Sequence, residues 1–287
     1  MGRAFLVGIG LNAGFVVLEI IAGLAANSVA LLADAGHNLS DVLGLVVAAV
    51  AVLLSRRLPS PRFTYGLGAS SILAALLNAM LLLVAVGALV WEAIGRFTHP
   101  AEVGGPTMML VAGLGILVNG GTALLFLSGR KDDLNVRGAF LHMVTDAAVS
   151  AGVVIGGLVI LLTGWTVIDP ILSLLIAVGI FASTWELLKD SVSHALHGVP
   201  EEVDPAAVRQ HLLAQPGVTS VHDLHIWPLS TSEIALTAHL VMPGGSPGDA
   251  AIFALQNELH HLFEIGHATL QVETGPETCP LAPDHVV

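Results

Sequence analysis

Six apolar stretches, separated by short polar segments, dominate the chain up to about residue 188. Each approaches or exceeds the roughly 20 apolar residues that a helix needs to cross about 30 Å of hydrocarbon. The break between the first two, Ala25–Ser28, is short enough to predict a tight helical hairpin. The predicted membrane spans are Ala4–Leu24, Val29–Leu54, Ser70–Phe97, Thr107–Leu127, Gly138–Thr163 and Ile168–Leu188. Six crossings place both termini on one side of the membrane.

From Pro200 onward the pattern changes to that of a small soluble α+β domain. Asp204 is a suitable N-cap for a first helix, and Ser246 or Asp249 for a second. The expected elements are a helix to about Ala214, strands at Val218–Trp227 and Glu233–Met242, a helix to about Phe263 and a strand at Ala268–Glu273. The order αββαβ indicates a truncated ferredoxin-like, metallochaperone-like domain. We therefore expect residues 1–198 to form a six-helix transmembrane domain and residues 199–287 a separate C-terminal domain.

Composition supports this division of the chain. Hydrophobic residues make up 54% of the 287 residues and charged residues 11%, as is typical of an integral membrane protein. The net charge is -12, but from His197 onward eleven acidic residues stand against one basic residue, Arg209. Such an acidic domain disfavours a nucleic-acid partner and attracts cations instead.

Basic residues mark one face of the predicted membrane domain. Under the positive-inside rule, loops rich in Lys and Arg stay in the cytoplasm. Arg96 alone falls at the opposite face. The residues that flank the basic face are Arg3, Arg56, Arg57, Arg62, Arg130, Lys131, Arg137 and Lys189. Both termini and the C-terminal domain are therefore predicted to be cytoplasmic.

The motif HxxxD occurs twice within the apolar stretches, as His37 with Asp41 and as His142 with Asp146. A spacing of four residues places each imidazole and carboxylate on one face of a helix, about one turn apart. An Asp at the middle of a membrane helix costs roughly 2.5 to 3.5 kcal/mol on insertion, so such residues usually mark an ion or proton pathway. Two such pairs facing each other would form a metal site with four ligands.

Two imidazoles and two carboxylates suit tetrahedral Zn²⁺, and two ionised aspartates neutralise its charge in a medium of low dielectric constant. All four groups also bind protons, so metal and protons compete for the site. The alternative is that the pairs only hydrogen-bond between helices, which is an expensive use of four titratable groups. Asp34, three residues before His37, is predicted to support the ligands or relay protons.

Other polar residues in the spans can be interpreted in two ways: they line a hydrated path, or they form hydrogen bonds between helices. For Asn12, Asn78 and Asn119 we expect hydrogen bonds between helices, and for Glu19 and Glu92 both readings stay open. Cys279 is the single cysteine, so no thiolate cluster can form within one chain. Histidine and carboxylate groups are therefore expected to carry any metal chemistry.

Several runs together resemble the cation diffusion facilitator family of zinc transporters. The run NSVALLADAGHNLSD at Asn27–Asp41 resembles the family's second helix, and FLHMVTD at Phe140–Asp146 is a second match. Further matches are Asp169–Pro170 in the sixth span, and His222–Trp227, Ala238–His239 and Leu270–Glu273 in the C-terminal domain. The resemblance covers essentially the whole chain.

The resemblance implies a homodimer in a lipid membrane that exports Zn²⁺ from the cytoplasm in exchange for protons. Each protomer would carry one transport site, formed by His37, Asp41, His142 and Asp146, and alternate between inward-facing and outward-facing states. This ligand set looks like the zinc-preferring branch, which in some members takes Cd²⁺ or Co²⁺. No organic cofactor is implied, and the compact loops and the resemblance favour a bacterial inner membrane.

In the family the cytoplasmic domain dimerises and binds regulatory zinc. The positions that match here are His222, His239, His267 and Glu273, and we expect His225, His260, His261 and Cys279 to lie outside that site. The segment Tyr65–Ile72 departs from the family, because it lacks the charged and histidine residues that relatives often place there. A loop metal site and a charge link between protomers are therefore not expected.

Two other classes of protein can be weighed against a secondary transporter. An intramembrane metalloprotease would need an HExxH helix with a glutamate as general base, and the sequence has none. The absence of a GxxxxGK[ST] motif favours the proton gradient over ATP as the energy source. A membrane-embedded metal sensor that binds without transport remains the alternative.

Overall fold

The computed structural model describes residues 3–55, 58–126, 134–275 and Cys279. Within these ranges the side chains of residues 3–9, 11, 41, 45, 48, 49, 51, 52, 55, 125, 126 and 134–139 are not described. The chain divides into two compact units, Met1–Val46 with Leu77–Leu187, and Val47–Leu76 with Leu188–Val287.

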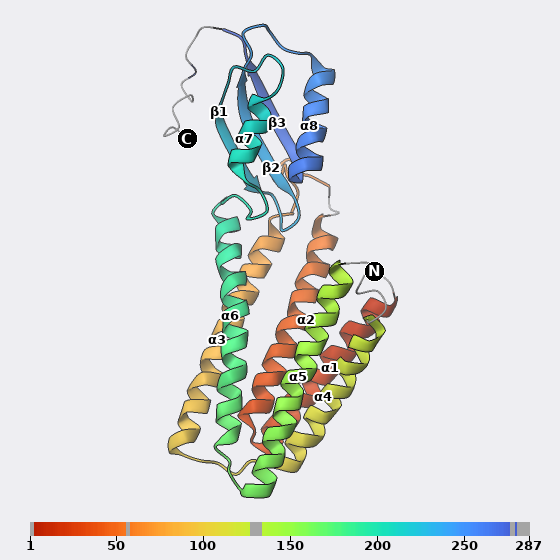
Figure 1. The fold of residues 1–287 in the computed structure, drawn as a ribbon, viewed down its shortest axis with the longest axis vertical. Helices are drawn as coiled ribbons and strands as arrows, with labels where there is room; N and C mark the ends of the chain where they lie inside the picture. The colour runs from red at the N-terminus through yellow and green to blue at the C-terminus, as the bar shows by residue number, and fades with distance from the viewer. Residues whose placement is uncertain (1–2, 56–57, 127–133, 276–278, 280–287) are drawn as a thin grey trace. The chain divides into compact units, whose positions relative to one another are not determined.

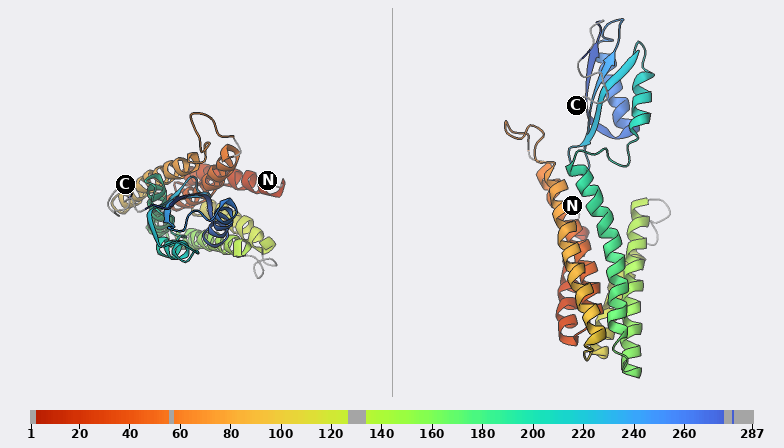
Figure 2. Two further views of the ribbon diagram at one scale, coloured as in Figure 1. Left: turned by 90° about the horizontal axis from the view of Figure 1, so that it is seen from above. Right: turned by 90° about the vertical axis from the view of Figure 1, so that its left-hand side faces the viewer.

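Six long helices occupy the apolar part of the described chain and lie side by side in Figures 1 and 2. They are α1 (Arg3–Ala26), α2 (Val29–Ser55), α3 (Ser70–Thr98), α4 (Gly105–Phe126), α5 (Leu134–Thr163) and α6 (Ile168–Ala195). Of the described helices, four are long and apolar enough to cross a membrane, and α1 adds a shorter apolar segment, Asn12–Ala26. These helices confirm the predicted helical membrane domain.

The outer surface of these helices is apolar. In the most apolar window of each of the four helices, only 22% to 33% of the residues are buried inside the protein. The remaining side chains, such as Leu24, Trp91, Leu117 and Leu162, are exposed, which is stable only where lipid replaces water. The fold therefore requires a bilayer around it.

Small residues allow α4 and α5 to pack closely. A Cβ atom added to Gly157 would lie 2.7 Å from Met109 Cγ, and one added to Gly105 would lie 2.9 Å from the carbonyl oxygen of Gly157. Small residues at helix contacts are the usual means of close approach in membranes, where lipid supplies no hydrophobic force between helices. This contact fixes the position of α5, which carries one HxxxD pair.

A carboxylate on α6 caps the start of α2, the helix that carries the other HxxxD pair. Asp169 accepts hydrogen bonds from Ser28 Oγ, from the Val29 amide at 2.8 Å and from the Ala30 amide at 3.2 Å. Ser28 Oγ in turn accepts from the Leu31 amide at 3.1 Å. All these residues are buried. The first amides of a helix have no partner within it, so Asp169 satisfies them and fixes one end of α2 against α6.

The C-terminal domain has the predicted element order αββαβ. It consists of α7 (Pro205–Leu213), β1 (Ser220–Pro228), β2 (Ile234–Val241), α8 (Asp249–Phe263) and β3 (Ile265–Glu273). The sheet order is β1-β2-β3, with β1 and β2 antiparallel and β2 and β3 parallel. Both helices pack on this sheet in Figure 1, over a core that includes Val208, Leu212, Leu236, Leu240 and Leu259.

The helix ends in this domain test the predicted caps. Asp204 caps α7 as expected, since its side chain accepts from the Ala206 amide at 2.9 Å. The predicted cap of α8 is wrong, because its N-cap is Gly248, with φ of 87° and no side-chain hydrogen bond. Ser246 Oγ instead accepts from the Gly248 amide at 3.4 Å, within the preceding turn. Asp249 lies in the first helical turn, where a negative charge is favourable.

Candidate metal centres

One acidic side chain joins the two HxxxD helices. Asp146 of α5 is 2% exposed, and its Oδ1 lies 3.0 Å from His37 Nε2 of α2. Its Oδ2 lies 3.6 Å from His142 Nε2, one turn earlier on α5. The centroids of the two imidazole rings are 6.2 Å apart. Two nitrogens and a carboxylate thus converge from two helices, as the sequence spacing predicts.

Asp41 follows His37 by one turn of α2, but its side chain lies outside the described part of the structure. Asp34 precedes His37 on the same helix and is 1% exposed. Its Oδ2 accepts a hydrogen bond from Ser150 Oγ of α5 at 3.2 Å. Three of the four proposed ligands are therefore gathered at one place, and Asp34 joins α2 to α5 one turn away.

A polar cavity of about 390 Å³ opens onto this cluster. Asparagine side chains dominate its polar lining, and they include Asn12, Asn78 and Asn119, for which we expected hydrogen bonds between helices. Asn119 is buried, and among the described residues its Nδ2 has no hydrogen-bond partner. The polar residues of the lining are Asn12, Asn38, Ser40, Asn78, Asn119, His142 and Asp146. Buried amide groups around a cavity suit water or a hydrated ion, so we interpret this cavity as a hydrated path.

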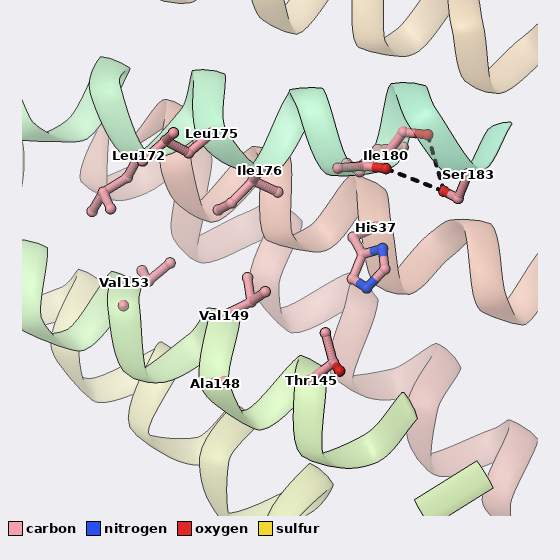
Figure 3. A pocket seen from close by; sticks show the side chains of 12 residues that line it. His37, Thr145, Ala148, Val149, Val153, Leu172, Leu175, Ile176, Ile180 and Ser183 are labelled. Carbon is pink, nitrogen blue, oxygen red and sulfur yellow. Dashed lines mark hydrogen bonds between the residues drawn. The ribbon is translucent and has the colours of Figure 1, made fainter. Parts of the chain in front are cut away.

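A second cavity, of about 410 Å³, lies on the other side of His37. Figure 3 shows the His37 ring between Thr145 of α5 and the α6 residues Ile180 and Ser183. Most of its remaining lining is aliphatic, from Val149 and Val153 on α5 and from Leu172, Leu175 and Ile176 on α6. Beyond His37, Thr145 and Ser183 this cavity offers an ion no ligands, whereas the first cavity is lined by several amide groups.

A second group of metal-ligating side chains lies on the sheet of the C-terminal domain. His222 of β1 is paired with His239 of β2, and their ring centroids are 5.1 Å apart. Glu273 at the end of β3 places Oε1 2.9 Å from His239 Nδ1 and Oε2 3.4 Å from His222 Nε2. Cys279 adds Sγ at 3.7 Å from His239 Nδ1. One ligand atom from each of the four residues lies within 4.8 Å of the others.

Cys279 was expected to lie outside this site, and its position changes the predicted chemistry. A thiolate is a strong ligand for Zn²⁺, so the donor set is no longer restricted to histidine and carboxylate. His267 does not join the group. It lies opposite Ala235 at the start of β3, six residues before Glu273, which corresponds to roughly 20 Å along a strand.

Asp223 is the residue that the sequence analysis missed. A register shift between His222 and His225 marks an irregularity in β1, and Asp223 there has a φ of 50°. Its Oδ2 lies 3.3 Å from His239 Nε2, and its Oδ1 lies 2.9 Å from His225 Nε2. His239 is thus flanked by two carboxylates. A regular strand would have pointed Asp223 to the face opposite His222, so only the bulge brings it near.

The electrostatics of this group favour a bound cation. Burial opposes ionisation of Glu273, but its hydrogen bond with Cys279 and the charges of His222 and His239 lower the pKa of this carboxyl group. Glu273 therefore remains an ionised ligand as the pH falls. An ionised carboxylate beside two imidazoles and a thiol suits the binding of a divalent cation.

Comparison with known proteins identifies the family. Residues 5–194 match the family described as the cation efflux transmembrane domain, and residues 200–275 match the cation efflux protein, cytoplasmic domain. The zinc transporter ZitB of Escherichia coli is 40% identical over 96% of this chain and 88% of its own length. The metal cation efflux system protein CzcD of Cupriavidus metallidurans is 36% identical, over 96% and 87%.

A cadmium, cobalt and zinc/H(+)-K(+) antiporter of Bacillus subtilis is 34% identical over 91% of this chain and 85% of its own length. Among solved structures, the metal-bound C-terminal domain of the CzcD transporter is 42% identical. The match covers 25% of this chain and 99% of that domain, with a TM-score of 0.23. The matches to both family domains, and relatives aligned over most of their length, show that this chain belongs to the cation efflux family, the cation diffusion facilitators.

Proposed function

We propose that this protein is a secondary transporter that exports divalent metal ions, chiefly Zn²⁺, from the cytoplasm in exchange for protons. The convergence of His37, His142 and Asp146 beside a polar cavity carries the proposal. Relatives named as zinc transporters and as a zinc/H(+)-K(+) antiporter agree with it. Titratable groups are costly inside a membrane. Two histidines and a buried carboxylate at one place are therefore explained by ion binding.

The transport site we propose consists of His37, Asp41, His142 and Asp146. Asp41 is one helical turn from His37 on α2, which is the spacing that pairs His142 with Asp146 on α5. With both aspartates ionised, a bound Zn²⁺ is neutralised within the membrane. Nitrogen and oxygen donors in equal number suit Zn²⁺, and also Cd²⁺ and Co²⁺, better than an oxygen-only site would.

Exchange with protons follows from the contact between His37 and Asp146. At 3.0 Å the two groups can hold a proton between them when no metal is present. Zn²⁺ needs the lone pair on the imidazole nitrogen and the charge on the carboxylate, so its binding expels that proton. After the helices rearrange, protons from the more acidic side restore the pair and release the metal.

The polar cavity is the proposed path from the cytoplasm. The basic residues at one face of the membrane domain predict that this face, both termini and the C-terminal domain are cytoplasmic. The organisms of the relatives favour the plasma membrane of a bacterium.

We place the boundary between the two domains at residues 198 and 199.

The C-terminal domain is proposed to form the homodimer contact and to bind a regulatory metal ion. The ligands would be His222, His239, Glu273 and Cys279, with no organic cofactor. The match to a cytoplasmic domain of the cation efflux family supports this assignment. The acidic surface around this domain would raise the local concentration of metal ions.

Cys279→Ser is expected to weaken metal binding by the C-terminal domain about tenfold, because it replaces a thiolate by a hydroxyl group that stays protonated. Zinc titration of the full protein in an Asp146→Asn background isolates this site from the transport site. His260→Ala, on the exposed face of α8, is the matched control. Equal affinity in Cys279→Ser and the control would remove Cys279 from the ligand set.

Zinc accumulation in bacteria that lack their own zinc exporters tests the proposed function. Cells that express the protein are expected to hold less zinc and to tolerate more of it, whereas cells that express Asp146→Asn should match the empty-vector control. If the wild-type protein binds zinc but leaves the cellular zinc content unchanged, the protein is a sensor and the proposal fails.

A further inference from the structure

Two carboxyl groups that belong to neither metal centre are completely buried between the membrane helices. Glu19 of α1 is 0% exposed and Asp34 of α2 is 1% exposed. The two side chains lie within hydrogen-bonding reach of each other. The transport ligands do not require Glu19, so its presence in the membrane interior needs its own explanation.

Each carboxyl group has one oxygen with a hydrogen-bond donor and one without. Asn38 Nδ2 donates to Glu19 Oε2 at 2.8 Å, and Ser150 Oγ donates to Asp34 Oδ2 at 3.2 Å. The remaining oxygens, Glu19 Oε1 and Asp34 Oδ1, are buried and have no hydrogen-bond partner among the described residues. Glu19 and Asp34 thus each have one oxygen with a donor and one oxygen without.

An ionised carboxylate can only accept hydrogen bonds, so with both groups ionised Glu19 Oε1 and Asp34 Oδ1 would stay buried and charged without a donor. Such a pair is costly where the dielectric constant is low. A single proton between the two oxygens gives each a hydrogen bond and removes one charge, as in other carboxyl pairs that share a site. A bridging water could donate to both oxygens but would leave both charges in place.

The surroundings hold this pair in position. Gly115 of α4 lies against Ser150, the donor to Asp34, since an added Cβ atom would be 2.8 Å from Ser150 Oγ and 3.0 Å from Phe15 Cζ. The titratable groups nearest to the pair on the packed elements are His37 on α2 and Asp146 on α5.

We propose that Glu19 and Asp34 share one proton and form a proton-binding site that is separate from the metal ligands and serves the exchange. This inference rests on the proposed function and adds a location for one of its protons. Asn38, which donates to Glu19, also lines the polar cavity, so the pair has a polar connection to the proposed cytoplasmic path.

Zn²⁺ in the transport site would draw this proton out. The cation lies one helical turn from Asp34, where its charge favours the ionised form of both carboxyl groups. On binding, one proton leaves the shared position for the cavity and the pair gains one negative charge. When the metal departs, one proton returns and the hydrogen bond between Glu19 and Asp34 forms again.

Glu19→Gln is the diagnostic variant. Its amide can donate to Asp34 Oδ1 and accept from Asn38 Nδ2, so it imitates the shared-proton state without holding an acidic proton. Infrared difference spectra of the full protein with and without Zn²⁺ report protonated carboxyl groups directly through their C=O stretch. We expect a wild-type band that disappears on zinc binding and is absent from Glu19→Gln.

Proton release in weakly buffered detergent solution is the second readout. Glu19→Gln is expected to release about one proton fewer per bound Zn²⁺ than wild type, with similar zinc affinity. Glu92→Gln, an exposed glutamate of α3, is the control and should behave as wild type. Asp146→Asn should retain the metal-free band.

Three results would overturn the proposal: no carboxyl band in the metal-free wild type, a band that persists in Glu19→Gln, or equal proton release in Glu19→Gln and Glu92→Gln. The first needs no variant, so it stands even if Glu19→Gln fails to fold. Ser150→Ala provides a further check, because loss of its bond to Asp34 should shift the frequency of the band. Failure of transport would leave the band in place, so the two proposals fail separately.

Discussion

Asp146→Ala is expected to lower the rate of zinc transport at least about a hundredfold while the protein remains folded and dimeric. Asp146 contacts both His37 and His142, so its loss removes a ligand, a negative charge and the group that aligns both imidazoles. Loss of a residue that merely orients a metal ligand already costs 10- to 100-fold. Zinc flux into proteoliposomes, with dimer content checked by gel filtration, measures the effect.

Glu186→Ala, an exposed acidic residue on α6, is the matched control for the loss of a carboxylate and should transport at the wild-type rate. Asp41→Ala is expected to behave as Asp146→Ala if Asp41 is the fourth ligand. Substantial transport by Asp146→Ala, or equal loss in Cys279→Ser, would contradict the division into a transport site and a separate regulatory site.

Asp169→Ala is expected to have the second largest effect, and it acts on the fold. The substitution leaves Ser28 and the Val29 and Ala30 amides without their buried acceptor. A buried donor without a partner costs about 1 to 3 kcal/mol, so we expect a loss of about 3 kcal/mol in the free energy of unfolding. Thermal unfolding in detergent should show a markedly lower midpoint, and zinc transport should fall because α2 carries His37.

Two milder variants control for this effect. Asp169→Asn keeps one acceptor oxygen and should lie between wild type and Asp169→Ala. Ser28→Ala removes a single cap interaction and should cost about 1 kcal/mol. Metal binding by the C-terminal domain should be unchanged in all three. An unfolding midpoint of Asp169→Ala equal to that of wild type would show that the cap does not stabilise α2.

The pairing of His and Asp within each helix could be predicted because the geometry of a helix is local. A spacing of four residues in a helix fixes which side chains share a face, and the cost of a carboxylate in lipid makes each HxxxD pair conspicuous. His222 and His239 were predicted from the resemblance to the family, and their strands do pair. The role of Asp169 could not be predicted in this way, because its partners lie on a helix about 140 residues away.

Some residues and boundaries were predicted wrongly because they depend on backbone irregularities. The alternation of apolar and polar residues along a strand does not reveal these. Asp223 reaches His239 only because β1 departs from regular register, and Cys279, six residues after β3, gave no pattern that would place it beside His239. The start of β3 at Ile265 was also missed. Glu264, with φ of 59°, ends α8 so abruptly that the strand begins at the next residue, before any alternating pattern.

The most direct test of the account is zinc uptake into proteoliposomes loaded with a zinc dye, with and without a pH gradient, while the internal pH is recorded. If transport is coupled to protons at this site, the gradient accelerates zinc uptake and protons move in the opposite direction. Both signals vanish in Asp146→Ala. Zinc uptake that is indifferent to the gradient, or that persists in Asp146→Ala, would contradict proton-coupled transport through this site.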